Sequence, residues 1–223
     1  MAGKISVIAI DGPVAAGKTV VGRELARALG FGYLDTGIMY RAITWLALNH
    51  GITVDDETSL GELARSYPLG LMGEDCNQVL VDGHTLGPEL RDSTVDRNVS
   101  IISKAPMVRR ELVAQQRTTA AQGKIVMIGR DIGTVVLPDA DLKVYLTASP
   151  EKRAQRRWQE MQERGEVVEL LTVLSETIAR DEIDSGRDDS PLKPADDAWE
   201  LNTDGLDIQQ VVQKIVDRTI SPK

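Results

Sequence analysis

The sequence predicts an α/β fold in which helices flank a parallel β-sheet, and three observations support this. Short β-branched apolar runs, typical of buried strands, alternate along the chain with segments of helical periodicity. Strands that are separated by helices pair in parallel, because the chain needs a crossover between them. The first strand leads at once into a glycine-rich loop and a helix, an order typical of ligand-binding edges in such sheets.

The expected strands of this sheet are short segments that span residues 5–10, 31–35, 125–128, 142–146 and 199–202, and the first and third of them are mostly β-branched. The expected helices share an apolar stripe at helical spacing and span about 20–29, 39–49, 106–122 and 207–219. A further helix is expected to begin after Ser149, with Pro150 in its first turn, and to end at Gly165. Asp56 is expected to cap a short helix, and turn residues between positions 67 and 86 predict a small inserted β element.

The composition narrows the class of protein. A chain of 223 residues suits one α/β core with a small accessory region. Its formal net charge of −8 argues against broad binding to nucleic acid or to a membrane surface, so an anionic substrate needs local clusters of arginine. Cys76 is the single cysteine, which excludes an internal disulfide and a cysteine metal cluster. The sequence opens directly into the first strand, so we expect a cytoplasmic protein.

The most specific motif of the chain has the pattern G-x-x-x-x-G-K-T, carried by Gly12, Pro13, Val14, Ala15, Ala16, Gly17, Lys18 and Thr19. Between a strand and a helix, such a loop aims backbone N–H groups and a helix N-terminus at one point, which suits a polyphosphate. Lys18 would place a positive charge between the terminal phosphates, and the Thr19 hydroxyl would bind Mg²⁺. The alternative is an ordinary turn that happens to carry glycines. The motif predicts a site for ATP or GTP.

A second cluster follows the second expected strand. Thr36, Tyr40 and Arg41 bring a hydroxyl, a phenol and a guanidinium to the same edge of the sheet as the phosphate loop. Arginine can bind a phosphate through two parallel hydrogen bonds, which lysine cannot. The alternative is a helix cap at Asp35 or Thr36 beside a surface arginine. We interpret the cluster as a site for a second, anionic substrate.

A third cluster, Arg130-Asp131, is flanked by glycines and follows the buried strand at 125–128. Its place at the carboxyl end of a strand indicates a binding role, although a structural ion pair would give the same pattern. A fourth cluster consists of arginines and one carboxylate on a predicted helix–loop–helix: Arg153, Arg156, Arg157, Arg180, Asp184 and Arg187. A solvated helix face or a salt bridge is the alternative there. Beside a phosphate loop, this segment indicates a lid that excludes water from phosphoryl transfer.

With these motifs together, the chain resembles the bacterial-type cytidylate kinases, which are nucleoside monophosphate kinases. The resemblance rests on residues 11–19, 34–41, 129–134 and 190–192 and on the Arg180, Asp184 and Arg187 set, and it covers nearly the whole chain. It implies a P-loop kinase fold: a parallel five-stranded sheet flanked by helices, with an inserted monophosphate-binding element and a helical lid. Residues 1–223 would form one kinase domain with a core (1–35, 106–148 and 196–223), a monophosphate-binding region (36–105) and a lid region (about 149–195).

The resemblance also implies roles for individual residues. The acceptor phosphate would be held by Thr36, Arg41 and Arg130, beside Tyr40, while Ser100, Arg109 and Asp131 would contact the cytosine edge. Arg180 and Asp184 would bind the ribose hydroxyls, and Arg187 would lie in the acceptor site. ATP would be bound by residues 12–19 with Val20 and Arg157, and the catalytic residues would be Lys18, Arg130, Arg180 and Arg187. Val14, Val20 and Asn202 depart from the commonest family pattern, which puts the roles of these positions in doubt.

The implied reaction is ATP-dependent phosphorylation of CMP and dCMP by in-line transfer with Mg²⁺, in a protein expected to be a monomer without nucleic-acid or membrane partners. It requires no general base, and the only histidines, His50 and His84, are expected to be exposed loop residues outside the motifs. A related kinase with another small acceptor stays open as an alternative. A GTPase would normally carry a guanine-reading Asn/Thr-Lys-x-Asp motif, which the sequence lacks, and a nucleic-acid-binding module conflicts with the negative charge.

Overall fold

The computed structural model describes residues 5–72, 78–187 and 190–220. The chain divides into two compact units, Met1–Gly32 with Lys124–Lys223 and Tyr33–Gly123, and each is described by itself. The helix at 106–120 therefore groups with the second unit, whereas the sequence predicts it as part of the core. Cys76 and the turn expected at Gly73–Asp75 lie outside the described residues, as do Asp188 and Asp189 after the arginine cluster.

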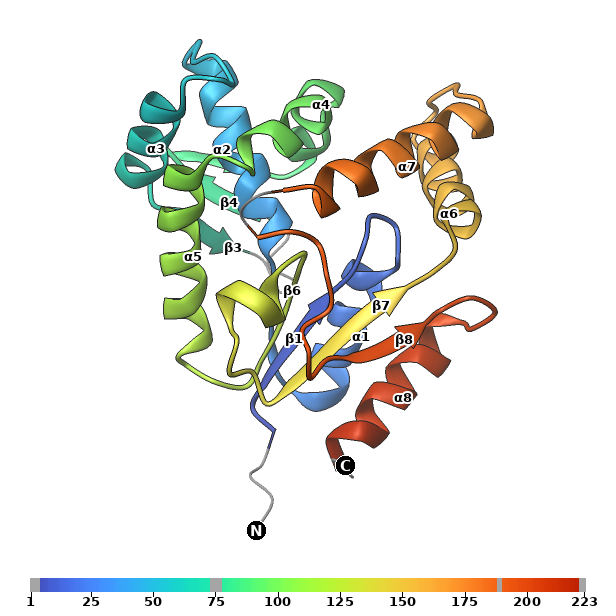
Figure 1. The fold of residues 1–223 in the computed structure, drawn as a ribbon. Helices are drawn as coiled ribbons and strands as arrows, with labels where there is room; N and C mark the ends of the chain where they lie inside the picture. The colour runs from blue at the N-terminus through green and yellow to red at the C-terminus, as the bar shows by residue number, and fades with distance from the viewer. Residues whose placement is uncertain (1–4, 73–77, 188–189, 221–223) are drawn as a thin grey trace. The chain divides into compact units, whose positions relative to one another are not determined.

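The expected five-stranded sheet is confirmed, with the strand order β2-β6-β1-β7-β8 (Figure 1). Its strands are β1 (Val7–Asp11), β2 (Gly32–Asp35), β6 (Ile125–Gly129), β7 (Leu142–Thr147) and β8 (Trp199–Asn202). β1 pairs in parallel with β6 on one side and β7 on the other, and β7 pairs in parallel with β8. β1 lies between β6 and β7, and the phosphate loop follows its carboxyl end. In open α/β sheets, ligands bind at the carboxyl ends of the strands.

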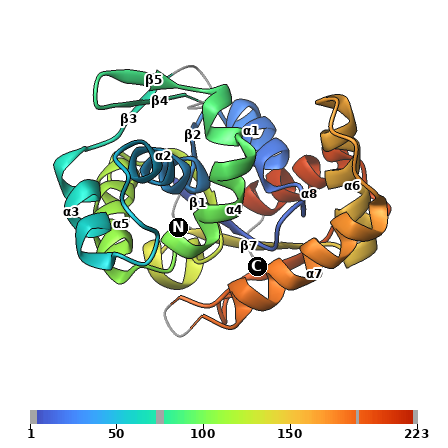
Figure 2. The same cartoon turned by 90° about the horizontal axis from the view of Figure 1, so that it is seen from above.

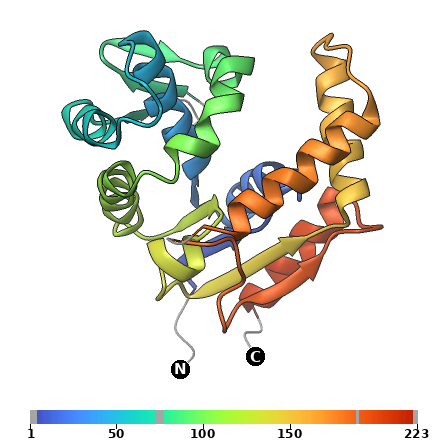
Figure 3. The same cartoon turned by 45° about the horizontal axis from the view of Figure 1, so that its top comes forward.

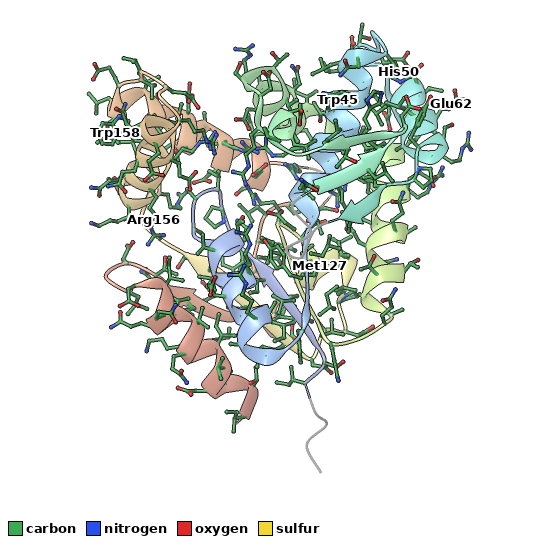
Figure 4. All side chains as sticks on the ribbon, turned by 180° about the vertical axis from the view of Figure 1, so that it is seen from behind. Trp45, His50, Glu62, Met127, Arg156 and Trp158 are labelled. Atoms are coloured by element: carbon green, nitrogen blue, oxygen red, sulfur yellow. The ribbon has the colours of Figure 1, made fainter. Side chains whose placement is uncertain are left out.

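The first unit buries an aliphatic core around β1. Ile8, Ala9 and Ile10 have no exposed surface, and every residue of β6 is buried, which is the reason these strands read as continuous apolar runs. α1 (Lys18–Leu29) packs against β6 and against α8 (Ile208–Ile220), and Figure 4 shows both helices in front of the sheet. α1 ends at Gly30 in the left-handed conformation, as the sequence predicts.

Two helices of the first unit, α6 (Pro150–Glu163) and α7 (Leu170–Ser185), pack side by side as a hairpin (Figure 3). The expected cap is present, because the Ser149 side chain accepts a hydrogen bond from the backbone N–H of Lys152. A hydrogen bond connects α6 to the loop of the hairpin: the indole N–H of Trp158 donates to the carbonyl oxygen of Val168 at 2.9 Å. The predicted arginine-rich helix–loop–helix is therefore confirmed.

The second unit combines helices with a small antiparallel sheet. Its helices are α2 (Thr36–Asn49), α3 (Glu57–Ser66), the 3₁₀ turn η1 (Pro88–Arg91), α4 (Ser93–Ile102) and α5 (Pro106–Ala120). Its strands are β3 (Gly70–Met72), β4 (Gln78–Val81) and β5 (His84–Leu86), with β4 in the middle and beside α2 (Figure 2). The inserted β element and the Asp56 cap of α3 are both confirmed.

Some details of the second unit differ from the sequence expectations. α2 begins at Thr36, three residues earlier than expected, because Asp35 accepts a hydrogen bond from the Gly37 N–H and caps the helix. α4 was not predicted, although Val95, Val99 and Ile102 give it a buried stripe. His84 lies in β5 and not in a loop, but it is exposed as expected.

The packing of α3 on α5 gives a test of the fold. A Cβ at Gly61 would come within 2.5 Å of Met107 Cβ, so Gly61→Ala must push the two helices apart. The cost of overpacking, about 1–3 kcal/mol, should exceed the gain of about 1 kcal/mol in helix propensity. We expect a net loss of about 1 kcal/mol in the free energy of unfolding, measured with urea. Glu62→Ala on the same helix, at an exposed position labelled in Figure 4, should change it by less than about 0.5 kcal/mol. A Gly61→Ala variant as stable as the parent would contradict the packing.

Candidate active site

The phosphate loop follows β1 and has the backbone shape that its glycines predict. Gly12, Ala15 and Gly17 all have positive φ, at 148°, 57° and 97°. Alternation into this region turns successive N–H groups toward one side, which creates an anion-binding concavity. Gly12 is required for a second reason, because a Cβ there would lie 2.2 Å from the carbonyl oxygen of Leu146 in β7.

The N-terminus of α1 and Lys18 complete this half of the site. Gly17 caps α1 in the left-handed conformation, and the N-terminus of a helix is a favourable site for a phosphate. Lys18 is buried, and its Nζ donates to the carbonyl oxygens of Gly12 and Pro13 at 2.7 Å each. The shape of the backbone and the charge of the lysine would suit a polyphosphate.

Two arginines of α6 hold the next carbonyl oxygens of the same loop. Arg153 donates from Nη1 to the oxygen of Val14 at 3.3 Å, and Arg156, labelled in Figure 4, donates from Nη1 to that of Ala15 at 3.4 Å. Four consecutive loop carbonyls, from Gly12 to Ala15, are thus bound by cationic side chains. These contacts fix the carbonyl side of the loop and hold its backbone shape.

Both arginines are themselves held in place. Asp181 of α7 binds Arg153 through both oxygens, at 3.1 and 2.5 Å, and Arg156 donates to the hydroxyl and carbonyl oxygens of Thr203 at 3.2 and 3.3 Å. The donors of Arg153 and Arg156 are therefore directed at protein oxygens. Arg157 lies 3.5 Å from Glu160 on the same helix.

A buried ion-pair cluster joins the strand end after β6 to α7. Asp184 is 1% exposed, and it accepts a hydrogen bond from Arg130 Nε at 2.9 Å and another from Arg187. Burial by itself raises the pKa of Asp184, but the charges of Arg130, Arg187 and Arg180 outweigh it and hold the pKa below its usual value. The structure thus brings together four residues of the predicted site: Arg130, Arg180, Asp184 and Arg187. The salt bridge that the sequence left open as an alternative is present among them.

Asp11, at the end of β1, is a functional candidate that sequence reasoning missed. Its carboxylate accepts hydrogen bonds from the backbone N–H groups of Ile132 and Gly133, at 2.8 and 2.7 Å. These residues begin a single π-helical turn, η2 (Ile132–Val136), that directly follows Arg130 and Asp131. Burial raises the pKa of Asp11 to about 6, although both N–H groups act in the opposite direction.

In the second unit, Arg41 is positioned by a carboxylate that the sequence did not single out. Arg41 Nη1 lies 2.6 Å from Asp96 Oδ1 and donates to the carbonyl oxygen of Leu90 at 2.8 Å. Asp96 belongs to α4, one turn before Ser100. The Arg41 side chain is about one-fifth exposed, so it is oriented by its partners and still reaches the surface.

The other predicted residues of the second unit lie on α2, α4 and α5. Arg109 is buried, and its Nη1 is 3.4 Å from both the Tyr40 hydroxyl and the carbonyl oxygen of Ser103. Its guanidinium carbon also lies 6.0 Å from the centre of the Tyr40 ring, a cation–π contact. Thr36 is buried in the first turn of α2, and Ser100 is half-buried on α4. A buried, oriented guanidinium suits the recognition of a flat polar group.

No group of three or more metal-ligating side chains occurs among the described residues. Mg²⁺ commonly binds through one or two protein oxygens together with substrate phosphates, so the Thr19 hydroxyl beside Lys18 fits such a site. In the described ranges, no helix has the length and apolar character needed to span a membrane.

The parallel sheet, the phosphate loop and the arginine clusters define a nucleotide-dependent phosphotransferase with a P-loop kinase fold. The sequence matches the cytidylate kinase family over residues 8–220. It is 48% identical over 209 residues to a cytidylate kinase of Desulfitobacterium hafniense, a match that covers 94% of this chain and 90% of that protein. A cytidylate kinase of Streptococcus suis is 46% identical over 213 residues, which is 95% of each protein.

A gluconokinase structure from Sinorhizobium meliloti has a similar fold, with a TM-score of 0.51 and 11% identity, over 97% of this chain and 93% of that one. At that identity, the likeness concerns the fold alone. The family match and the two relatives show the family as well as the fold, because they extend over nearly the whole sequence, the relatives at 46–48% identity. The chain belongs to the cytidylate kinase family, as its motifs predict.

The support of the phosphate loop by α7 can be tested through Asp181→Asn. The change leaves the buried Arg153 without its charged partner, so we expect a loss of about 1–3 kcal/mol in the free energy of unfolding. It should also raise KM for ATP, because Arg153 binds the Val14 carbonyl. Glu166→Gln is the matched control, since Glu166 is exposed and 4.0 Å from Arg164, and it should cost less than about 0.5 kcal/mol. Equal effects of the two variants in urea unfolding would show that Asp181 has no supporting role.

Proposed function

We propose that this chain transfers the terminal phosphoryl group of ATP to CMP and dCMP, forming the corresponding diphosphates. The observation that carries this proposal is the match to the cytidylate kinase family over residues 8–220. This range includes the phosphate loop and all of the arginine-containing clusters described above. ATP binds through residues 12–20, with Lys18 between the terminal phosphates and Arg157 near the donor nucleotide. The Thr19 hydroxyl would hold Mg²⁺ together with substrate phosphates, and the ion would supply positive charge to neutralise them.

The acceptor, CMP or dCMP, is bound by the residues that the family resemblance implies. Thr36, Tyr40, Arg41 and Arg130 hold its phosphate, a role supported by the fixed orientation of Arg41 beside Asp96. The cytosine edge is contacted by Ser100, Arg109 and Asp131, and the ribose by Arg180 and Asp184. We assign residues 36–105 to monophosphate binding and residues 149–195 to the lid. The enzyme works as a monomer in the cytoplasm, where ATP and nucleoside monophosphates occur together.

The chemistry requires positioning and positive charge more than proton transfer. A nucleoside monophosphate has a second phosphate pKa of about 6, so its attacking oxygen is already ionised at pH 7. Catalysis then depends on holding this oxygen in line with the γ-phosphate while charge on the transferring group is stabilised. Lys18, Arg130, Arg180 and Arg187 supply that charge. α7 carries Arg180, and Arg187 follows the end of this helix. Closure of the α6–α7 hairpin would exclude water that otherwise hydrolyses ATP.

Base selectivity tests the acceptor assignment. Asp131 can accept from the exocyclic amino group of cytosine, which uracil lacks, so the wild type should prefer CMP over UMP by about 10²-fold or more in kcat/KM. Asp131→Ala and Ser100→Ala should narrow this ratio, because they remove partners of the base. Ser93→Ala, at an exposed position of α4, should leave it unchanged. The assay is ADP formation with each acceptor at fixed ATP, and equal use of CMP and UMP by the wild type would contradict the pocket.

The ribose assignment of Asp184 is tested by comparing CMP with dCMP. If Asp184 contacts the 2′-hydroxyl, Asp184→Ala should lower kcat/KM about tenfold more on CMP than on dCMP, because dCMP lacks this group. Glu182→Gln, an exposed change on the same helix, serves as the control. Equal fold-losses on the two acceptors would leave Asp184 only its structural role between Arg130 and Arg187.

A further inference from the structure

The buried carboxylate of Asp11 lies at the junction of the two ligand-binding loops of the first unit. Asp11 is the last residue of β1, pairs in register with Gly129 of β6, and directly precedes Gly12 of the phosphate loop. Gly129 in turn precedes Arg130 and Asp131. One side chain therefore stands where the strand that carries the phosphate loop meets the strand that carries the Arg130-Asp131 pair.

The hydrogen bonds of Asp11 are directed at the backbone that follows this pair. Oδ1 accepts from the N–H of Ile132 and Oδ2 from that of Gly133, so the carboxylate caps the start of η2. The turn closes on Asp131, whose carbonyl oxygen accepts from the N–H groups of Val135 and Val136 at 2.9 and 3.1 Å. Asp131 is thus held between the end of β6 and a capped turn.

The surroundings of η2 require this close approach. A Cβ at Gly133 would lie 3.4 Å from Asp11 Oδ2 and 3.2 Å from Cδ of Lys143, so a larger residue would press on the carboxylate. Both N–H donors need an acceptor, and only an ionised carboxylate supplies one to each. An asparagine would place an NH₂ group against one N–H and leave a buried donor without its bond.

We propose that Asp11 is a positioning residue for the acceptor site: by capping η2, it holds Arg130 and Asp131 in the geometry that binds the monophosphate. This rests on the roles proposed above for Arg130 and Asp131. Asp11 itself touches no substrate in this scheme. Its effect reaches the acceptor through the backbone of residues 130–133.

The charged and titratable groups around Asp11 define when it can act. The charge of Lys18 in α1 favours the ionised form of Asp11, whereas the charge of Asp131 disfavours it. Burial, and then the charge of Asp11, raise the pKa of Tyr145 in β7. The amino group of Lys143 is bound to Asp197, at 2.8 and 2.9 Å. Since the pKa of Asp11 is raised to about 6, the cap is complete above that pH and loses one acceptor as the pH falls through it.

The kinetic test compares Asp11→Asn with Asp141→Asn. Asp141 also accepts two consecutive backbone N–H groups, those of Ser6 and Val7 at 2.8 Å each, but next to the opposite end of β1. Asp11→Asn should raise KM for CMP about tenfold and narrow the CMP/UMP ratio, while KM for ATP changes by less than about twofold. Asp141→Asn should change none of these. Similar increases in both KM values, or the same profile in the two variants, would overturn the proposal in favour of a general structural role.

A spectroscopic measurement avoids both misfolding and substrate titration. In the nucleotide-free wild type, the amide resonances of Ile132 and Gly133 should titrate together with a midpoint of about 6. The amides of Ser6 and Val7 should not share this midpoint. Absence of a common titration at Ile132 and Gly133 would overturn the cap itself. Gly133→Ala, which displaces the turn and keeps Asp11, should reproduce the KM pattern if Asp11→Asn does not fold.

Different experimental outcomes would contradict the positioning role of Asp11 and the proposed base pocket. Asp131→Ala without effect on the CMP/UMP ratio contradicts the proposed pocket, whatever Asp11 does. If Asp131→Ala changes the ratio and Asp11→Asn changes neither the ratio nor KM for CMP, the pocket stands and the positioning role of Asp11 is wrong.

Discussion

The structure depends on one constraint of the phosphate loop. A loop that turns its N–H groups toward a phosphate must turn its carbonyl oxygens elsewhere, and buried carbonyls need donors. Lys18 supplies donors to Gly12 and Pro13, and two arginines of α6 supply them to the next two residues. Because the same arginines bind Asp181 and Thr203, this requirement connects the loop to α7 and to the chain after β8.

The arginines divide into those that support the backbone and those that we propose bind substrates. Arg153 and Arg156 donate to loop carbonyls, so they act as scaffold. Arg41 and Arg130 are held by Asp96 and Asp184, which orient their guanidinium groups and balance part of their charge. A chain of net charge −8 can therefore bind anions, because the positive charge is concentrated and oriented locally. The carboxylates that do this are as much a part of the site as the arginines.

Much of the fold was predictable because its signals are local. The apolar residues of β1 favour a buried strand, and the glycines of the loop and at position 30 favour positive φ. These preferences do not depend on distant residues. α4 was missed because its apolar stripe is short and is meaningful only against the helices that bury it. The helix at 106–120 was assigned to the core, since periodicity shows that a helix has an apolar face but not which element covers it.

The sequence by itself determined the alternation of strands and helices along the chain, the phosphate loop and the family, because these are contained in local patterns and short motifs. Only the tertiary structure decided which charges meet. Arg153 with Asp181, Arg41 with Asp96, and Asp11 with the start of η2 are separated by 28, 55 and more than 100 positions, respectively. No local pattern encodes such pairs, because an ion pair or a cap depends on the distance between atoms after folding and not on spacing along the chain.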